Sequence, residues 1–342
     1  MKKTVAAMVP EESAHNTIPE LIDSGIADRS AKISKKGKFR LVPIDFDRID
    51  EVKGRFELCE TESHTLERLT PQERIRYALR HLPHGILEGL PMKWEFVGDV
   101  AIIRLPDGCT RFKDEIGKAY AEVLDVSTIC ADISGIAGEF RRPSTQIIYG
   151  DETESVRLEN GIFYDFDVTK VMFASGNTDE RMRMREMDCI GETVVDMFAG
   201  IGYFTLPIAK FTGARRVFAC EKNPDSYAFL LKNIKLNHVS DTVIPILGDN
   251  RHIPGKRFAD RILMGYVQTT SQFLPKALTI IKPGGTIHYH DTFPTGEQGS
   301  YINKIFSEVC DDYEILGIKE VKSFAPSISH YVADVKISDR LA

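Results

Sequence analysis

The stretch from Val194 to Phe204 reads V-V-D-M-F-A-G-I-G-Y-F and decides the fold of this chain. A short apolar run, typical of a buried strand, breaks into a turn with Gly200 and Gly202, and a helix is predicted from Tyr203 to Phe211. Glycine lets the backbone approach a ligand where a Cβ atom would collide, and the amides at a helix N-terminus attract polar groups. The pattern therefore predicts a site for a nucleotide-like ligand.

A second strand is predicted from Arg216 to Glu221, and it ends in a carboxylate about 20 residues after the turn, as in folds that bind a ribose. Dinucleotide sites usually carry a third glycine three residues after the second, but this chain has Thr205 there. Room for a pyrophosphate is therefore not indicated. The spacing favours S-adenosylmethionine over NAD as the cofactor.

Further strands are predicted at Val243 to Leu247, Arg261 to Met264 and Thr286 to His290, with helical patterns between them. Strands that alternate with helices indicate a doubly wound α/β fold with ligands at the carboxyl ends of the strands. The last two runs, Ile315 to Val321 and His330 to Val335, are too close for a helical crossover, so we expect an antiparallel hairpin. This ending is typical of class I methyltransferase folds.

The chain resembles the archaeal and eukaryotic family of tRNA (guanine-N1)-methyltransferases and wybutosine-synthesis enzymes from about Trp94 to its end. The matching motifs occur in the family's order. They are W-x-F-V-G-D-V-A-I-I at 94–103, E-N-G at 159–161, F-A-S-G-N-T-D-E-R-M-R-M at 173–184, D-M-F-A-G-I-G-Y-F at 196–204, E-K-N-P at 221–224, N-I-K-L-N at 233–237 and A-D-R-I-L-M-G-Y at 259–266. The resemblance implies an α/β, Rossmann-like, S-adenosylmethionine-dependent catalytic domain that acts on tRNA.

One turn favours a branch of this family. Methylating members carry an Asn-Pro type of turn after the fourth strand, whereas this chain has Met264-Gly265-Tyr266. The resemblance thus points to the branch that transfers the 3-amino-3-carboxypropyl group to a ring carbon of 4-demethylwyosine in tRNA-Phe. Two other readings stay open: N1-methylation of the unmodified guanine in the same tRNA, and a tRNA-binding protein that keeps the cofactor fold without catalysis. The geometry of the bound sulfonium would decide which carbon is transferred.

The matched motifs imply a set of cofactor contacts. Glu221 is expected on the ribose, Asp249 on the adenine amino group or in a plain turn, and Asp196 on the amino-acid end of the cofactor or as a loop cap. The full set of expected cofactor-binding residues is Ser175, Arg181, Asp196, Phe198, Gly200, Gly202, Phe204, Glu221, Lys222, Asn223, Asp249, Asn250 and Gly265.

Three residues are candidates for catalysis: Arg181, Tyr266 and His290. Arg181 could pair with the carboxylate of the cofactor or with a tRNA phosphate, or belong to a surface ion-pair network. Tyr266, like Tyr203, could stack on a flipped-out base or belong to the core. His290, followed by Asp291, is expected to line the base pocket. The proton acceptor is not identified by the sequence.

The alternate positions of His288 and His290 raise the question of a metal. Zinc requires three or four ligands, and no other His or Cys pair lies at ligand spacing, so no metal is predicted.

The net charge of −6 requires a local basic patch if the partner is a tRNA. Six basic residues and no acidic residue lie between Arg29 and Arg40, although such a run can also be a solvated face. The predicted tRNA-binding residues are Arg29, Lys32, Lys35, Lys36, Lys38, Arg141 and Arg142.

Composition and pattern suggest three parts: a small tRNA-contacting module at 1–65, an α/β middle domain at 66–176 and the catalytic domain at 177–342. The charged stretch from Asp50 to Thr70 is predicted to connect the first two. No apolar run approaches the 18 or so residues of a membrane span, and six cysteines show no C-x-x-C spacing. A monomer in the reducing cytoplasm, without membrane contact, is expected.

Overall fold

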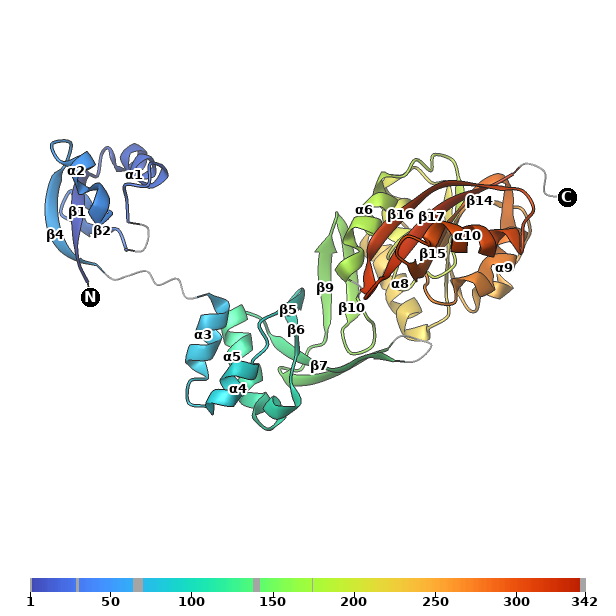
Figure 1. Cartoon of the computed structure of the whole chain (residues 1–342), viewed down its shortest axis with the longest axis horizontal. Helices are drawn as coiled ribbons and strands as arrows, with labels where there is room; N and C mark the ends of the chain where they lie inside the picture. Colours follow the sequence, from blue (N-terminus) through green and yellow to red (C-terminus); the bar gives the residue numbers. More distant parts are fainter. Residues whose placement is uncertain (1, 29–30, 64–69, 138–141, 174, 339–342) are drawn as a thin grey trace. The chain divides into compact units, whose positions relative to one another are not determined.

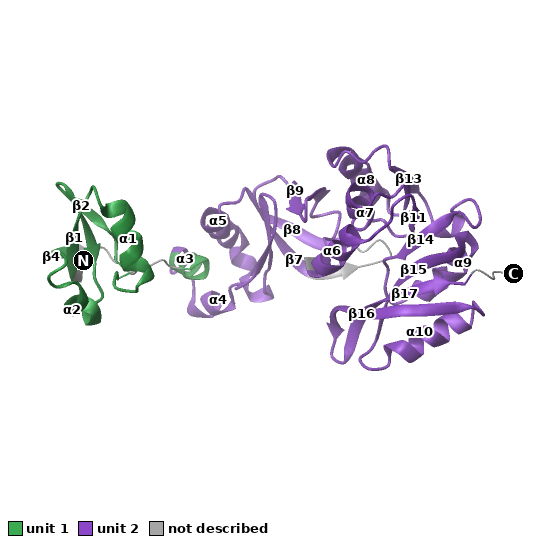
Figure 2. Cartoon of the chain, turned by 90° about the horizontal axis from the view of Figure 1, so that it is seen from above, with its two compact units in different colours: residues 1–77 green, residues 78–342 purple. Residues whose placement is uncertain are grey.

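The computed structural model describes residues 2–28, 31–63, 70–137, 142–173 and 175–338. The chain divides into two compact units, residues 1–77 and 78–342, which Figure 2 colours separately. No described helix combines the length and the apolar character that crossing a membrane would require.

The first unit is a four-stranded sheet in the order β2-β3-β1-β4 with a helix packed on it. Leu21 of the helix and Val9 and Val42 of the sheet form its core, because all three side chains are fully buried. Its elements are β1 (Lys2–Pro10), α1 (Ala14–Asp23), β2 (Ser34–Lys36), β3 (Phe39–Pro43), α2 (Ile49–Val52) and β4 (Glu57–Ser63).

Strand β4 corrects one prediction, because it lies within the stretch Asp50–Thr70 that was expected to be a connection. It pairs antiparallel with β1, with Ala6 opposite Cys59. Only Leu58 and Cys59 are apolar in β4, so its charged residues hide the strand pattern. An edge strand tolerates such charges because part of it faces water.

The second unit begins with helices and a four-stranded sheet in the order β5-β6-β7-β8. A two-stranded hairpin follows, closed by Asn160-Gly161, which both adopt the positive φ that a tight hairpin turn requires. The elements are α3 (Pro71–Ala78), which spans the division between the units, α4 (His84–Gly89), β5 (Trp94–Val97), β6 (Val100–Arg104), α5 (Lys113–Leu124), β7 (Thr128–Ala137), β8 (Arg142–Tyr149), β9 (Glu154–Glu159), β10 (Ile162–Asp167) and α6 (Thr178–Glu186).

The catalytic sheet has seven strands in the order β13-β12-β11-β14-β15-β17-β16. Figure 1 labels its strands β14, β15, β16 and β17. Strands β11 to β15 run parallel, and β17 joins β15 and β16 by antiparallel pairing, so the class I methyltransferase fold and its terminal hairpin are confirmed. The elements are β11 (Thr193–Asp196), α7 (Thr205–Phe211), β12 (Arg216–Glu221), α8 (Pro224–Leu236), β13 (Val243–Leu247), β14 (Ala259–Met264), α9 (Leu274–Ile280), β15 (Ile281–Pro294), α10 (Gln298–Ser307), β16 (Tyr313–Ala325) and β17 (Ile328–Ile337).

Both faces of this sheet are covered. Val194 belongs to a core cluster with Leu206 of α7 and Leu230 of α8. The next residue, Val195, belongs to a second cluster with residues of α9 and α10. Successive side chains of a strand point to opposite faces, so strands buried on both sides are continuously apolar. The chain order reverses between β11 and β14, which is where ligands bind in such sheets.

Candidate functional site

A cavity of about 460 Å³ lies at the carboxyl ends of the parallel strands. This volume is within the range of small-molecule sites. Its lining comes from the segments that follow β11, β12, β13 and β14, together with a short turn at Ser175–Asn177 and the β16–β17 hairpin. Residues of the predicted cofactor set that line it are Phe198, Gly200, Glu221, Lys222, Asn223, Asp249, Asn250 and Gly265.

Glu221 holds the glycine turn. Its Oε2 accepts a hydrogen bond from the Gly200 amide at 2.7 Å, and its Oε1 accepts one from the Asn223 amide at 2.6 Å. Burial raises the pKa of the Glu221 carboxyl, while these backbone amides oppose the rise. A carboxylate has about four acceptor positions and Glu221 meets three backbone amides, the third from Lys222, so the side chain can still accept from a hydroxyl of a ribose in the cavity.

The two glycines of the turn have different roles. Gly200 lines the cavity with φ at +56°, whereas Gly202 does not line it. A Cβ atom on Gly202 would lie 2.6 Å from Cγ of Leu206. Gly202 therefore permits close packing of the turn on helix α7, rather than the ligand approach that the sequence suggests.

Asp196 is fully buried and is absent from the cavity lining. Its carboxylate accepts from the Phe198 amide at 3.1 Å and from the Thr205 hydroxyl at 2.8 Å. Burial raises the pKa of Asp196 to about 6. Of the two roles considered for this residue, the geometry supports the loop cap, and the side chain is not part of the cavity lining.

The contact with adenine that the sequence suggests for Asp249 fits the neighbouring residue Asn250 better. Asp249 caps the following turn through the Arg251 amide and pairs with the Arg251 guanidinium at 2.6 Å, which holds the pKa of the carboxyl well below its usual range. Asn250 donates to the Met197 carbonyl at 2.9 Å, whereas its Oδ1 is buried without a hydrogen-bond partner in the described part of the chain. An unmet acceptor on the cavity wall fits the exocyclic amino group of adenine.

Arg181 does not reach the cavity. It is 1% exposed, its Nε donates to Glu159 Oε1 at 2.5 Å, and its guanidinium lies 4.7 Å from the centre of the Phe173 ring. The ion pair connects helix α6 to strand β9, and the ring contact connects it to the segment that follows β10. The expected contact of Arg181 with a cofactor carboxylate or a phosphate is therefore replaced by a structural ion pair.

Two other polar side chains stand where a charged amino-acid group could bind. Asn177 lines the cavity, and its Oδ1 is buried with no hydrogen-bond partner among the described residues. Lys322 of β16 also lines the cavity, and its Nζ lies 3.4 Å from the position of a Cβ built on Gly176. An acceptor and an ammonium in the lining of one cavity suit an α-ammonium and an α-carboxylate, respectively. The side chain of Ser175 lies outside the described residues.

The turn after β14 makes an aromatic wall. Tyr266 stacks on Phe198 with ring centres 5.0 Å apart, and Phe273 meets Phe198 edge-on at 5.0 Å. A Cβ atom on Gly265 would lie 2.7 Å from the ring of Phe204. Phe204 is buried behind the lining and packs on His290, so Gly265 is required by packing. A planar base could stack on the wall that Tyr266 provides.

His290 is fully buried. It does not line the cavity, although the sequence predicts that it does. Its Nδ1 lies 3.1 Å from Nε2 of His330, and it is His330 of β17 that reaches the lining. Asp291 is held by the Gln268 amide at 2.5 Å and by Tyr289. A lone histidine in a strand carries no periodic signal, so the sequence does not single out His330.

The neighbouring His288 is held by protein groups. Its Nδ1 lies 2.6 Å from Asp334 and its Nε2 lies 2.8 Å from Arg261. No group of three His, Cys, Asp or Glu side chains suited to a metal occurs among the residues that the structure describes.

The predicted tRNA-binding residues are exposed where they are described. Lys32, Lys36 and Lys38 face solvent, whereas Lys35 and Arg40 both pair with Glu11, at 2.9 and 2.8 Å. Arg29 and Arg141 lie outside the described residues, and of Arg142 only the backbone at the start of β8 is described.

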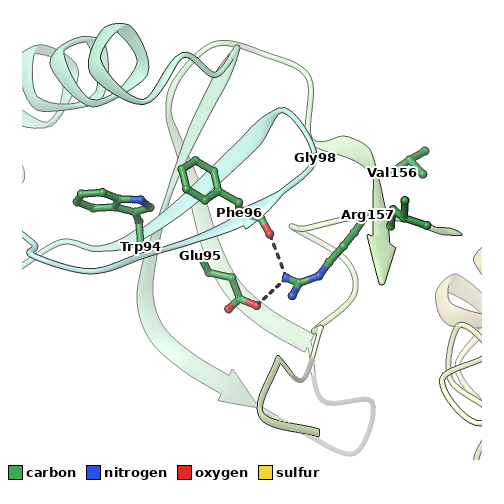
Figure 3. Close-up of a pocket in the computed structure, with 7 residues that line it drawn as sticks. Trp94, Glu95, Phe96, Gly98, Val156 and Arg157 are labelled. Atoms are coloured by element: carbon green, nitrogen blue, oxygen red, sulfur yellow. Dashed lines mark hydrogen bonds and ion pairs between the residues drawn. The ribbon is translucent and has the colours of Figure 1, made fainter. Parts of the chain in front are cut away.

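A second, shallow hollow of about 690 Å³ lies between the edge strands β5 and β9 (Figure 3). Its cation, Arg157, donates to the Phe96 carbonyl at 3.0 Å and lies 3.5 Å from Glu95 and 3.3 Å from Glu159. Gly98 allows the β5–β6 turn to lie close to β9, because a Cβ on Gly98 would lie 2.7 Å from the Val156 carbonyl oxygen. The charge of this hollow is thus compensated within the protein, and the cavity at the strand ends is the candidate active site.

Comparison with known proteins agrees with this geometry. Residues 155–315 match the TRM5/TYW2 methyltransferase domain and residues 75–153 match the TYW2 N-terminal domain. The tRNA(Phe) (4-demethylwyosine(37)-C(7)) aminocarboxypropyltransferase of Pyrococcus horikoshii is 43% identical over 269 residues, which cover 77% of this chain and 96% of the relative.

Two solved structures are similar. The structure of P. horikoshii TYW2 in complex with MeSAdo has a TM-score of 0.71 at 40% identity and covers 78% of this chain and 99% of its own. The structure of Trm5b from Pyrococcus abyssi has a TM-score of 0.78 at 35% identity and covers 98% and 99%, respectively. From the matched domains, the identity and the coverage together, the chain belongs to the TRM5/TYW2 methyltransferase family.

Proposed function

We propose that this enzyme transfers the 3-amino-3-carboxypropyl group of S-adenosylmethionine to C7 of 4-demethylwyosine at position 37 of tRNA-Phe. The relative from P. horikoshii that carries this activity in its name is 43% identical and is covered almost completely. A second archaeal relative of the same name, from Methanocaldococcus jannaschii, is 39% identical over 98% of its length.

The observation that carries the proposal is the turn after β14. Gly265 is confined by the Phe204 ring, so no side-chain amide can stand at this position to hold a ring N–H. A ring carbon as acceptor needs no such group. Tyr266 and Phe198 instead offer a flat aromatic surface at this edge of the cavity.

The remaining lining residues would hold and orient the donor. Glu221 would accept from ribose hydroxyls, Asn250 from the adenine amino group, and Asn177 with Lys322 would bind the amino-acid end. When bound, the cofactor supplies an electrophilic carbon next to its sulfonium. Anchoring the amino-acid end fixes which of the sulfonium carbons meets the base, because transfer needs the reacting atoms in line at about 3 to 3.5 Å.

N1-methylation of guanine in the same tRNA is the second candidate. Trm5b of P. abyssi is 36% identical over 98% of this chain, so its similarity includes the first unit, whereas the match to the P. horikoshii transferase covers 77% of the chain. The non-catalytic reading is disfavoured, because Glu221, Gly200 and the cavity are all in place.

The exposed lysines of the first unit support tRNA contact by that unit. We further infer that the protein is a monomer and that it works in a reducing cytoplasm. The six free cysteines support the second of these inferences.

Two batches of S-adenosylmethionine test the proposal, one labelled in the methyl group and one in the carboxyl carbon. Each is incubated with the enzyme and with tRNA-Phe in its unmodified or 4-demethylwyosine form. We expect carboxyl label only in the tricyclic tRNA. Methyl label in unmodified tRNA would assign the protein to the methylating branch, and no label in either tRNA would favour a binding protein.

A further inference from the structure

Three titratable side chains form a line from the cavity wall into the interior. His330 of β17 lines the cavity, His290 of β15 lies behind it, and Glu180 of α6 lies behind His290. Nε2 of His330 is 3.1 Å from Nδ1 of His290, and Nε2 of His290 is 3.4 Å from Oε1 of Glu180. The three residues are 5%, 0% and 1% exposed.

The surroundings favour one protonation state of this line. Burial holds the pKa of His290 well below its ordinary value, so the ring is neutral and carries one N–H. Nε2 of His290 is buried and makes no hydrogen bond among the residues that the structure describes, and Oε1 of Glu180 lies 3.4 Å from it. A carboxylate favours a donor opposite it, so the Nε2–H tautomer of His290 fits these surroundings, and in that tautomer Nδ1 can accept from Nε2–H of His330.

Other charged groups support the inner end of the line. Glu180 binds the Arg183 guanidinium at 2.6 Å, and Arg183 also binds Asp334 at 3.0 Å. Phe204 covers the His290 ring at 5.4 Å between ring centres. Phe204 thus covers the middle of the line, the ion pair with Arg183 holds its inner end, and its outer end reaches the cavity.

The proposed reaction releases one proton, and the sequence names no acceptor for it. When C7 gains a carbon substituent, the S–C bond breaks and its electron pair leaves with sulfur. The C7–H bond must then break, its electron pair must return to the ring, and the proton must go to a base.

We propose that His330 accepts the proton from C7 and that His290 and Glu180 relay it into the protein. His330 takes the proton on the ring nitrogen that does not face His290 and passes its Nε2 proton to Nδ1 of His290. His290 passes its own Nε2 proton to Glu180. The 3.4 Å separation at the inner end must shorten during transfer, as catalytic hydrogen bonds often do once the substrate is bound. The inference rests on the proposed function.

The test compares His330→Gln and His330→Ala with the parent enzyme in single turnovers, on precursor tRNA carrying hydrogen or deuterium at C7. Glutamine keeps a polar side chain but cannot take the proton. We expect both variants to lose about 100-fold or more in rate, within the usual contribution of a general base, and to gain a primary isotope effect that the parent lacks. His238→Asn, which changes an exposed histidine outside the cavity lining, serves as the matched control.

Binding and spectroscopy separate this role from a structural one. The His330 variants should bind S-adenosylmethionine within about threefold of the parent, and ¹⁵N spectra of the free enzyme should show His290 as the neutral Nε2–H tautomer. An Nδ1–H tautomer, an unchanged rate in His330→Gln, or a slower rate without an isotope effect would overturn the relay. If the parent itself transfers no carboxyl label, the proposed function fails instead.

Discussion

The Glu221 carboxylate and the Gly200 amide, 21 residues apart in sequence, are joined by a hydrogen bond of 2.7 Å. This bond connects the end of β12 to the turn that follows β11. It gives one side chain two tasks, because the carboxylate that we assign to the ribose also holds the shape of the loop beneath it.

Replacing Glu221 should therefore weaken cofactor binding strongly. We expect Glu221→Ala and Glu221→Gln each to raise the dissociation constant for S-adenosylmethionine by about 10- to 100-fold, because hydrogen bonds to a charged group contribute about 1.5 to 3 kcal/mol. Isothermal titration calorimetry measures this, with the exposed Glu152→Ala as control. Unchanged affinity in Glu221→Ala would refute the ribose assignment.

Asn177 and Lys322 should recognise only the amino-acid end of the donor. We expect Lys322→Met and Asn177→Ala to weaken binding of S-adenosylmethionine by about 10-fold while methylthioadenosine, which lacks this end, binds as before. Both ligands can be titrated into each variant, with the exposed Lys304→Met as control. Equal losses for the two ligands would place these side chains elsewhere in the site.

Gly265→Ala tests the packing of the turn after β14. Its Cβ would lie 2.7 Å from the buried Phe204 ring, so we expect a loss of about 1 to 3 kcal/mol in the free energy of unfolding. Urea denaturation measures the loss. Gly108→Ala is the matched control, since a Cβ there meets nothing within 4 Å. A variant as stable as the parent would show that the ring moves freely.

Asp196 should make stability depend on pH. Its pKa is about 6 in the folded protein against an ordinary value of about 4 for an unfolded chain, so the folded state binds more protons between these values. Stability therefore falls as pH rises from about 4 to about 6. Asp196→Asn removes this contribution. As the pH rises from about 4 to about 7, the free energy of unfolding of the variant should therefore increase by about 2 to 3 kcal/mol relative to that of the parent. The exposed Asp241→Asn should show no such trend, and a difference between Asp196→Asn and the parent that stays constant with pH would contradict the assignment.

The exposed lysines of the first unit should contribute to tRNA affinity. Reversing Lys32, Lys36 and Lys38 to Glu should weaken tRNA binding and reduce the salt dependence of log K by about 1 for each phosphate that the variant no longer neutralises. Filter binding across a salt series measures both. The same reversal at the exposed Lys235, Lys256 and Lys304 controls for net charge. An equal effect of the two sets would remove the special role of the first unit.

Strands and turns of the catalytic domain were predictable because their signals are local. Strand β12 runs from Arg216 to Glu221, as the apolar run and its terminal carboxylate predict. Strand β4 was not predictable, since its stability comes from pairing with β1 rather than from an apolar pattern of its own. A periodic apolar pattern appears in a strand when one of its faces is buried, and a charged edge strand buries little apolar surface.

The sequence by itself determined the class I fold, the S-adenosylmethionine site at the strand ends and the glycine turns that shape it, because glycines, strand-end carboxylates and apolar runs act over a few residues. Only the tertiary structure decided which side chains face the cavity. It placed Arg181, Asp196 and His290 behind the wall and brought Asn177, Lys322 and His330 into it. These three come from a turn before α6 and from the last two strands, so their meeting depends on long-range strand pairing that no local pattern encodes.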